Sequence, residues 1–458
     1  MEYKENVLEL IGNTPLVKLN RLADDTMATV LVKMEQLNPG GSVKDRMAVN
    51  MVRRAEEAGL IRSGATLVES TSGNTGMGLA MTAAVRGYKA IFTMPDKMSK
   101  EKVEMLKAYG AQVVITRTDL DHDHPDSYVE VAKRIARETP NAFYTDQYYN
   151  MNNPEAHYLT TGPEIWEATA GNLDALVGGI GTGGTISGCG KYLKEKAAQV
   201  GREVKVVCPD PMGSIYREEF LTGKHTAHGT YRVEGIGHDF MVGTLDFSVV
   251  DEVRNISDRD SFLTARRLAR EEGIFCGGST GTAVFGGLQV AKEMGPDKTV
   301  VVILCDSGDR YLSKCFDDDW MKDMGYFDVE QRLGTVKDLL EFKCGRVEFA
   351  DPKEDLASIA ARMSELGISQ MPLKSTNGDY KMIHEVDLLQ RLVSGNCSLT
   401  DPVSEAATLL QGKVTTNSPL SEVQKIFDQH NVAIVMDNDA VIGVISKIDV
   451  VEFLAARQ

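Results

Sequence analysis

Four short glycine-rich segments carry the groups that could do chemistry: PGGSVKDR (39–46), TSGNTG (71–76), GTGGT (181–185) and CGGSTG (276–281). Lys44 follows two glycines in the first segment, where the sequence predicts the first turn of a helix. The positive field at a helix N-terminus favours the neutral form of an amine, and a neutral amine is a nucleophile. A solvated surface lysine is the simpler alternative. Four such loops in one chain nevertheless favour covalent chemistry at Lys44.

The GTGGT segment has the features of a phosphate-binding loop. It follows the apolar run ALVGGI and precedes the helical segment ISGCGKYL. Backbone N–H groups at the start of a helix bind anions, and the two threonine hydroxyls can add hydrogen bonds. The residues expected to bind the phosphate are Gly181, Thr182, Gly183, Gly184 and Thr185.

The phosphate compound expected here is a cofactor. GTGGT lacks the lysine of a P-loop, and the chain after it lacks the GxGxxG spacing with a ribose-binding acid, which disfavours ATP and NAD. A phosphate site without a metal-binding acid suits a monophosphate that is held permanently. Together with Lys44, the loop predicts pyridoxal phosphate held as a Schiff base.

The elements that position these loops alternate between helical and strand patterns from about residue 40 to 305. A helix is expected after Ser42, its candidate N-cap, and before Gly59, with one apolar face formed by Met47, Met51, Val52 and Ala55. Buried parallel strands are expected at 66–68, 90–94, 113–116, 175–180, 204–208 and 300–305. The pattern predicts an α/β fold with a doubly wound, mostly parallel sheet, whose ligand sites lie beyond the carboxyl ends of the strands.

The C-terminal part repeats itself. Residues 346–389 and 413–454 align as two copies, in which Pro352 matches Pro419 and Asp387 matches Asp449. We therefore expect one domain at 1–328 and a tandem module at 329–458. The repeats of the module are expected at about 335–395 and 400–458.

The order of the motifs carries a family resemblance. PGGSVKDR, TSGNTG, GTGGT, VEGIG (233–237), CGGSTG and ILCDSGDRYLS (303–313) resemble the fold-type II pyridoxal-phosphate enzymes that make cysteine and cystathionine, over about residues 5–327. MPDKMSKEKVEMLKAYGA, DQYYN and VEGIGHDF resemble the cystathionine β-synthase branch, whereas TTGPEIW and SGDRYLS resemble O-acetylserine sulfhydrylase. The tandem resembles paired CBS (Bateman) modules, which plain cysteine synthases lack. The resemblance favours the synthase branch and implies two subdomains, the smaller at about 40–145.

The resemblance assigns residues to the cofactor. Lys44 is expected to form the Schiff base and to act as base and acid, and Asn74 to donate to the pyridoxal 3-oxygen. Ser307 is expected to meet the pyridine nitrogen, which a serine leaves neutral, so that β-elimination is favoured over transamination. Haem is not expected, because no extension with cysteine and histidine haem ligands precedes the catalytic motifs.

A second set of residues is expected to bind the substrate, mainly through its carboxylate. The set comprises Thr71, Ser72, Thr75, Gln147 and Gly235. His238 stands where the animal synthases have a tyrosine after GIG, so the contacts to the second substrate are expected to differ.

The second repeat contains a pattern that suits an adenosyl ligand. In GVISKID (443–449), the Ser446 hydroxyl can reach a phosphate or ribose oxygen, and the Asp449 carboxylate can accept from ribose hydroxyls. S-adenosylmethionine and an adenine nucleotide are the candidates. The alternative is structural, with Ser446 capping a helix and Asp449 in its first turn. In the first repeat His384 replaces the hydroxyl, so at most one good site is expected.

Composition excludes several other functions. The net charge of −16 disfavours nucleic acid and membrane surfaces as partners. No apolar run or leader pattern indicates a membrane span or export, so a cytoplasmic location is expected. A homodimer or higher homo-oligomer is also expected. Seven scattered cysteines read as reduced core residues, and no metal-ligand spacing occurs.

The activity expected is condensation of L-serine, or an activated serine, with L-homocysteine to L-cystathionine in transsulfuration, with hydrogen sulfide as a further product. Cysteine synthase, using O-acetylserine and sulfide, is the alternative. A serine/threonine dehydratase and a non-catalytic adenosyl-ligand sensor are more distant ones.

Overall fold

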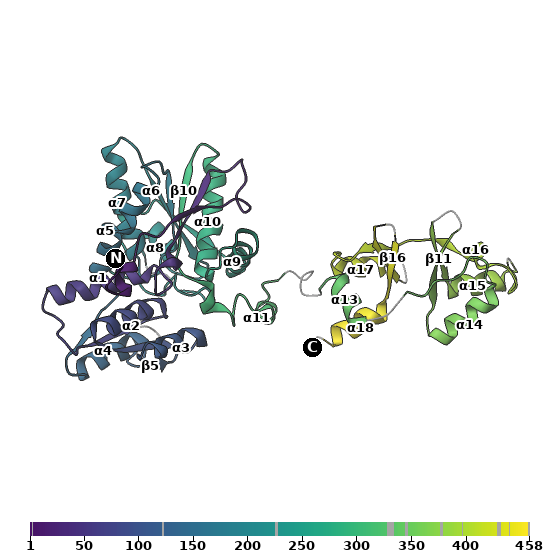
Figure 1. Cartoon of the computed structure of the whole chain (residues 1–458), viewed down its shortest axis with the longest axis horizontal. Coiled ribbons are helices and arrows are strands. Elements are labelled where there is room, and N and C mark those ends of the chain that lie inside the picture. Colours follow the sequence, from purple (N-terminus) through teal and green to yellow (C-terminus); the bar gives the residue numbers. More distant parts are fainter. Residues whose placement is uncertain are drawn as a thin grey trace. The chain divides into compact units, whose positions relative to one another are not determined.

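The structure is a computed structural model that describes residues 1, 3–120, 123–224, 228–327, 334–343, 347–375, 379–395, 397–427, 432–438 and 440–456 (Figure 1). The chain divides into two compact units, Met1–Tyr326 and Phe327–Gln458. The boundary expected between residues 328 and 329 lies outside the described residues.

A twisted sheet forms the centre of the first unit. Its strand order is β1-β2-β10-β7-β8-β9, and every neighbouring pair is parallel except the edge pair β1 and β2. The strands are β1 (Leu16–Lys18), β2 (Thr29–Met34), β7 (Ala175–Val177), β8 (Lys205–Pro211), β9 (Glu252–Ile256) and β10 (Thr299–Leu304).

Helices cover both faces of this sheet. On one face of β10, Val301 and Ile303 pack in an apolar cluster with residues of α7. On the other face, Val300, Val302 and Leu304 pack in a second cluster with residues of α9 and α10. The helices are α5 (Asn152–Leu159), α6 (Thr161–Ala168), α7 (Gly184–Gln199), α8 (Tyr216–Thr222), α9 (Asp258–Glu272), α10 (Gly278–Met294) and α11 (Asp318–Asp323). This arrangement confirms the doubly wound α/β fold.

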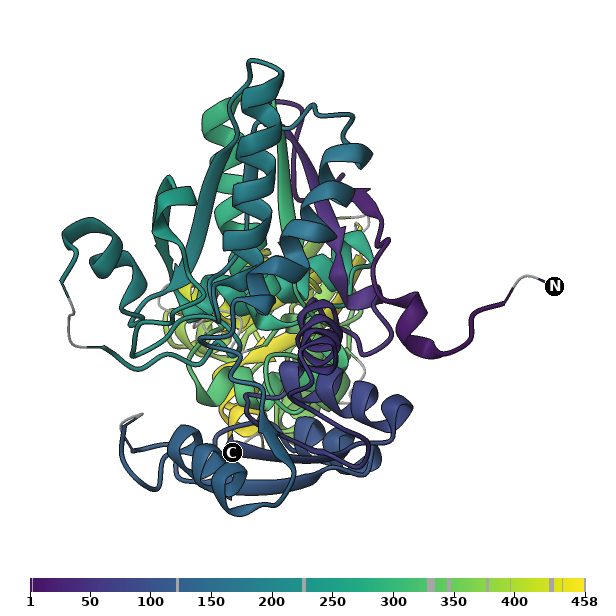
Figure 2. The same ribbon diagram turned by 90° about the vertical axis from the view of Figure 1, so that its left-hand side faces the viewer.

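A second, fully parallel sheet has the order β5-β4-β3-β6. Its elements lie below those of the larger sheet in Figure 1, where α2, α3, α4 and β5 are labelled, and Figure 2 shows the same separation. The strands are β3 (Thr66–Ser70), β4 (Lys89–Pro95), β5 (Gln112–Thr116) and β6 (Ala142–Tyr144). The associated helices are α1 (Lys44–Glu57), α2 (Asn74–Arg86), α3 (Lys100–Ala108) and α4 (Tyr128–Glu138).

The six predicted strands are all present, and the predicted apolar face of α1 is buried. The predicted N-cap is wrong: Val43 occupies that position, although the Ser42 hydroxyl accepts a hydrogen bond from the Lys44 N–H at 3.2 Å. The helix starts late because Ser42 pairs with Asp306 in a β-bridge, which holds its backbone outside the helix. Short 3-10 helices complete the unit at Val7–Leu10, Glu35–Leu37, Phe247–Val249 and Gly308–Tyr311.

The second unit contains two small sheets, with strand orders β11-β12-β13 and β14-β15-β16. The strands are β11 (Gln370–Lys374), β12 (Tyr380–His384), β13 (Thr408–Leu409), β14 (Lys413–Thr415), β15 (Val432–Asp437) and β16 (Ala440–Ser446). The helices are α13 (Val336–Lys343), α14 (Leu356–Leu366), α15 (Glu385–Val393), α16 (Val403–Ala406), α17 (Leu420–Phe427) and α18 (Lys447–Ala455).

The two halves of this unit exchange segments. Helix α13 lies at the start of the predicted first repeat (335–395), but its Val336 and Leu339 pack in the core of the second, with Leu420 and Val423. Conversely, Val403 of α16 packs in the core of the first repeat. Each structural half is therefore completed by a segment from outside its own sequence repeat.

Several absences apply to the described residues only. No helix among them is long and apolar enough to cross a membrane, and they contain no cluster of three or more histidine, cysteine or acidic side chains that could hold a metal ion. Their cysteines are free thiols, of which Cys305 and Cys397 are only partly buried and the others are in the core as predicted. Cys344 lies outside the described residues.

Candidate active site

The four glycine-rich loops meet at one pocket of about 450 Å³. It lies beyond the carboxyl ends of β7 and β10, and each loop brings the first turn of a helix to its wall. Its lining includes Lys44 of α1, Asn74 of α2, Thr185 of α7 and Ser279 of α10, and no lining residue is acidic. Four helix N-termini with polar side chains and no carboxylate make this pocket a site for an anionic compound.

The GTGGT loop is held in a shape that exposes its backbone to the pocket. Gly183 caps α7 with φ of +84°, a conformation that favours glycine. A Cβ on Gly181 would lie 2.3 Å from the carbonyl oxygen of Gly235, so this position requires glycine. The Tyr216 hydroxyl donates to the Gly181 carbonyl at 2.9 Å, which fixes the start of the loop.

Of the five residues predicted to bind phosphate, Gly181, Thr182, Gly183 and Thr185 line the pocket. Gly184 is the first residue of α7 and is buried between them. Gly235, predicted for the substrate, lines the same pocket.

Lys44 is the first residue of α1 and lines the pocket with its half-buried side chain. In the described part of the chain, its amine forms no hydrogen bond or ion pair. The amine is thus available to a bound compound, as its predicted role requires.

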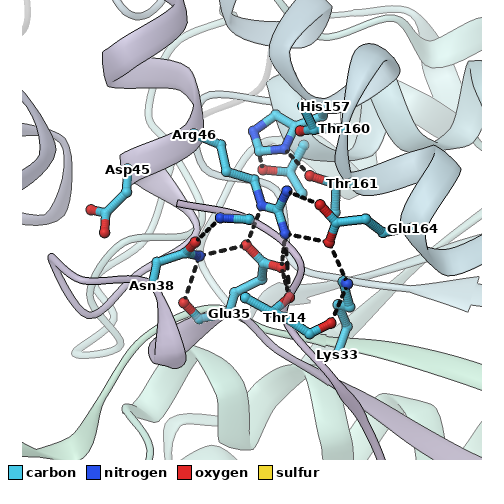
Figure 3. A network of polar contacts seen from close by, with 12 residues as sticks. Thr14, Lys33, Glu35, Asn38, Asp45, Arg46, His157, Thr160, Thr161 and Glu164 are labelled. Atoms are coloured by element: carbon cyan, nitrogen blue, oxygen red, sulfur yellow. Dashed lines mark hydrogen bonds and ion pairs between the residues drawn. The ribbon is translucent and has the colours of Figure 1, made fainter. Parts of the chain in front are cut away.

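The helix that carries Lys44 is anchored by a buried ionic network (Figure 3). Arg46 binds Glu35 through Nε at 2.7 Å and Glu164 through NH1 at 2.7 Å, and Lys33 binds Glu164 at 2.6 Å. Burial alone would raise the pKa of Glu164, but its contacts with Arg46 and Lys33 lower it to about 2. The network ties the first turn of α1 to β2 and α6, and so fixes the position of the Lys44 backbone.

Asn74 is held from both ends of its amide. Its Nδ2 donates to Asp306 Oδ2 at 2.7 Å, and its Oδ1 accepts from the Arg310 guanidinium. Tyr311 donates to the same Asp306 oxygen at 2.6 Å. Because Arg310 can only donate, the amide orientation is fixed, and the second Nδ2 hydrogen is free for a cofactor oxygen.

The structure places the predicted Ser307 and a second serine, Ser279, differently with respect to the pocket. Ser307 does not line the pocket; it caps the 3-10 helix Gly308–Tyr311, and its N–H donates to the Gly41 carbonyl at 3.2 Å. Ser279, buried in the first turn of α10, lines the pocket instead. Ser279 belongs to the CGGSTG motif, but the sequence alone did not show whether this serine or Ser307 faces the pocket.

The residues predicted to hold the substrate carboxylate form a connected group beside Asn74. Thr71 Oγ1 accepts from the N–H groups of Gly73 and Gly76, and the Thr75 hydroxyl donates to Gln147 Oε1 at 2.6 Å. Ser72 is only partly buried. The pocket lining includes none of these four residues. A substrate carboxylate bound to them would therefore lie at the edge of the pocket.

A buried carboxyl supports this loop from behind. Glu69 lies at the end of β3 and accepts from the Gln147 N–H at 3.0 Å, the Thr145 hydroxyl and the Ser70 N–H. Burial raises the pKa of Glu69 to about 7 against the lowering effect of these hydrogen bonds. Glu69 therefore couples β3 to the segment that carries Gln147.

The residues present fit pyridoxal phosphate. The pocket offers an unpaired amine at Lys44, an oriented amide at Asn74, a glycine loop whose Cβ positions are closed by neighbouring backbone and side-chain atoms, and an acid-free wall. These are the groups that an aldehyde, a phenolic oxygen and a phosphate require.

In the second unit, the pair predicted to bind an adenosyl ligand is already engaged. Both the N–H and the hydroxyl of Ser446 donate to Asp449 Oδ2 at 2.7 Å, which is the geometry of the capping alternative. Lys343 of α13 also binds this oxygen at 2.7 Å. Burial alone would raise the pKa of Asp449, but Lys343 and Ser446 hold it below its usual value.

Comparison with known proteins identifies the family. The family model described as pyridoxal-phosphate dependent enzyme matches residues 7–306, and the CBS domain model matches residues 413–456. The cystathionine beta-synthase of Dictyostelium discoideum is 38% identical, over 99% of this chain and 93% of that protein. A probable cysteine synthase of Bacillus subtilis is 46% identical, over 67% of this chain and 96% of that protein.

A solved structure extends the comparison. A hydrogen sulfide-producing enzyme from Fusobacterium nucleatum is similar with a TM-score of 0.63 and 36% identity, over 68% of this chain and all of that one. The near full-length match with the first relative includes the C-terminal module, which the shorter relatives do not span. With its loops gathered at one acid-free pocket around Lys44, the chain belongs to the cystathionine β-synthase family of pyridoxal-phosphate dependent enzymes.

Proposed function

We propose that this chain condenses L-serine, or an activated serine, with L-homocysteine to form L-cystathionine. One observation carries the proposal: relatives named cystathionine beta-synthase match 98% or 99% of the chain, whereas the cysteine synthases match 67% or 68%. The name of those relatives supports the substrate pair, and the products test it.

The pocket residues divide the work of binding. The GTGGT loop would hold the cofactor phosphate, Asn74 the phenolic oxygen, and Ser279 rather than Ser307 the ring nitrogen. Bound pyridoxal phosphate supplies an electron sink for the negative charge that develops at the substrate Cα. A serine beside the ring nitrogen leaves it neutral, which moderates that sink and favours loss of the β-substituent.

Lys44 would move the proton. Its amine is unpaired in the described part of the chain and stands at the pocket wall, so it can take the proton from the substrate Cα and return it to product. Water leaves Cβ of serine, or acetate leaves Cβ of O-acetylserine, before the thiol adds there. One side chain would therefore serve as anchor, base and acid.

The TSGNTG loop would hold the substrate carboxylate. The start of α2 offers backbone N–H groups and the Ser72 hydroxyl. Thr75 and Gln147 bind each other in this structure, so either side chain must exchange that partner, or Gln147 acts by holding Thr75 in place.

Product analysis tests the proposal. The purified chain is incubated with serine or O-acetylserine, each with homocysteine or sulfide, and the products are quantified by mass spectrometry. Serine with homocysteine is expected to yield cystathionine at the highest kcat/KM. Turnover of O-acetylserine with sulfide alone would contradict the proposal.

Cysteine synthase is the second candidate, and the 46% identity with the Bacillus subtilis protein favours it. The likeness to a hydrogen sulfide-producing enzyme supports sulfide release as a further activity. The same four incubations, with a sulfide probe, separate these activities.

For the tandem module we propose an adenosyl ligand, S-adenosylmethionine or an adenine nucleotide, at Ser446 and Asp449. A match to the CBS domain model over residues 413–456 supports this choice. Because Lys343 now binds the Asp449 carboxylate, the ligand must displace that amine before its ribose can bind. Assembly of the chain as a homodimer or larger homo-oligomer is proposed alongside.

A further inference from the structure

Helix α5 lies directly against the start of α7. A Cβ on Gly188 of α7 would lie 2.2 Å from the Pro154 carbonyl oxygen and 2.8 Å from Cβ of His157. A Cβ on Gly184 would lie 2.0 Å from Oδ1 of Asn153. These close approaches place Asn153 and His157, one helical turn apart on α5, beside the GTGGT loop.

Asn153 fixes the hydroxyl of Thr182. Its Nδ2 donates to the Gln147 carbonyl at 2.9 Å and to Thr182 Oγ1 at 2.9 Å. The carbonyl can only accept, so the amide nitrogen must face this side, and Thr182 must accept. In the described part of the chain nothing accepts the Thr182 hydroxyl hydrogen, and Thr182 lines the pocket. That hydrogen is therefore free to point at a pocket anion.

His157 is placed to do the same for Thr185. The buried ring contacts Thr161 Oγ1 through Nδ1 at 2.9 Å and Thr185 Oγ1 through Nε2 at 3.2 Å, and Figure 3 shows it beside Thr161. Burial, with the charges of Arg46 and Lys44, holds the pKa of His157 well below its usual range. A neutral ring has one donor and one acceptor.

The two tautomers have opposite effects on the pocket. With the proton on Nε2, the ring donates to Thr185 and accepts from Thr161, so the Thr185 hydroxyl hydrogen can point into the pocket. With the proton on Nδ1, Thr185 must donate to the ring and would present only lone pairs to a phosphate. Repulsion between those lone pairs and a dianion makes the second tautomer incompatible with phosphate binding.

We propose that Asn153 and His157 are positioning residues for the phosphate. Each donates to one threonine of the GTGGT loop and so turns that hydroxyl hydrogen toward the pocket. The loop then offers donors only, which matches a dianionic phosphate monoester. This inference rests on the proposed placement of the cofactor phosphate in the loop.

The tautomer of His157 is the direct test. The full-length chain is labelled with ¹⁵N-histidine, and long-range ¹H–¹⁵N correlations are recorded with and without cofactor, the signal being assigned through the His157→Gln variant. Protonated Nε2 and unprotonated Nδ1 are expected in both states. A proton on Nδ1 in the loaded protein would overturn the inference. The tautomer is measured on the parent chain, and the His157→Gln variant serves only to assign the signal.

The affinity of the apoprotein for cofactor is the second test. His157→Leu is expected to bind pyridoxal phosphate about 10-fold more weakly, because the Thr185 hydroxyl loses the donor that turns its hydrogen toward the phosphate. Its affinity for pyridoxal, which lacks the phosphate, should stay the same. His157→Gln should restore most of the loss, since its amide can donate to Thr185 and accept from Thr161.

Asn153→Asp is expected to weaken phosphate-dependent binding by at least about 10-fold, because the donor becomes an acceptor and adds a negative charge. Asn152→Asp on the same helix introduces the same charge without a side-chain contact to the loop and is the matched control. His228→Leu, at an exposed position, is the control for the histidine.

Thr185→Val distinguishes a failure of the proposed cofactor placement from a failure of the positioning inference. If it leaves the affinity for pyridoxal phosphate unchanged, the phosphate does not lie in the GTGGT loop and the proposed cofactor placement fails. If Thr185→Val weakens binding but His157→Leu and Asn153→Asp do not, only the positioning inference is wrong. Equal losses for pyridoxal and its phosphate would also contradict it, because they would indicate a general packing defect.

Discussion

Asp306 accepts a hydrogen bond from Nδ2 of Asn74 at 2.7 Å, and this contact joins the start of α2, beside the smaller sheet, to the end of β10 in the larger one. Of the pair, Asn74 lines the pocket, where it would meet the cofactor. The Asn74 amide is therefore oriented by a residue that directly follows a strand of the other sheet.

Asp306→Ala is expected to lower the unfolding free energy by about 2–4 kcal/mol, because the partly buried Asn74 amide and the buried Tyr311 hydroxyl lose their shared acceptor. Denaturant unfolding measures this, and the visible spectrum of the bound cofactor should shift because the Asn74 amide is released. Asp306→Asn, which keeps one acceptor oxygen, should lose less. An unchanged spectrum in the alanine variant would mean that Asp306 does not set the amide.

Lys44→Ala should lower kcat roughly 10²–10⁴-fold, the range expected for loss of a positioned acid and base. The cofactor should still bind through the GTGGT loop but become removable by dialysis. Absorbance after gel filtration measures how much cofactor remains bound. Lys18→Ala on the exposed edge strand β1 is the control. A fully active Lys44→Ala variant would refute the assignment of this lysine.

Ser279→Asp should alter the visible spectrum and lower kcat about tenfold or more, because it would bring a negative charge to a pocket wall that has no acidic residue. Ser307→Asp places the same group outside the pocket lining and is the matched comparison. A larger spectral change at residue 307 than at residue 279 would restore the prediction made from the sequence.

The pH dependence of stability should report on Glu69. Its folded pKa of about 7 lies above the unfolded value of about 4.3, so its contribution to stability is present at low pH and is lost as pH rises through about 7. Unfolding free energies of the parent should fall more between about pH 5 and pH 8 than those of Glu69→Gln, in denaturant titrations. Glu104→Gln, at an exposed site, should follow the parent. Parallel curves for the parent and Glu69→Gln would show that Glu69 is ionised throughout.

Removal of the amine that covers Asp449 should favour ligand binding. Lys343→Met is expected to tighten the binding of S-adenosylmethionine or an adenine nucleotide about threefold to tenfold, since an exposed ion pair need no longer be broken. Isothermal titration calorimetry measures this, and Asp449→Ala should abolish the heat. Asp387→Ala, at the matching position of the first repeat, is the control. Equal heat from the parent and Asp449→Ala would place the ligand elsewhere.

The sequence by itself determined the parts that depend on local patterns. The six apolar runs became parallel strands because β-branched residues without polar interruption must be buried on both faces of a sheet. The GTGGT loop could be predicted because its glycines, its hydroxyls and the following helix are contiguous. Lys44 stood out because it follows a pair of glycines at the start of a predicted helix, whereas Asn74 was assigned through the family resemblance.

Only the tertiary structure decided between residues that local patterns leave equivalent. Ser279 and Ser307 both lie in motifs that suit a contact with the cofactor ring. Which of them lines the pocket depends on how α10 packs against β10. The contacts of Asn74 with Asp306 and of Thr185 with His157 join segments that are far apart in the sequence. The same holds for Lys343 on Asp449, since α13 packs against the repeat that is distant in sequence. Such pairs are set by packing across the whole unit, and the composition of neither segment specifies its partner.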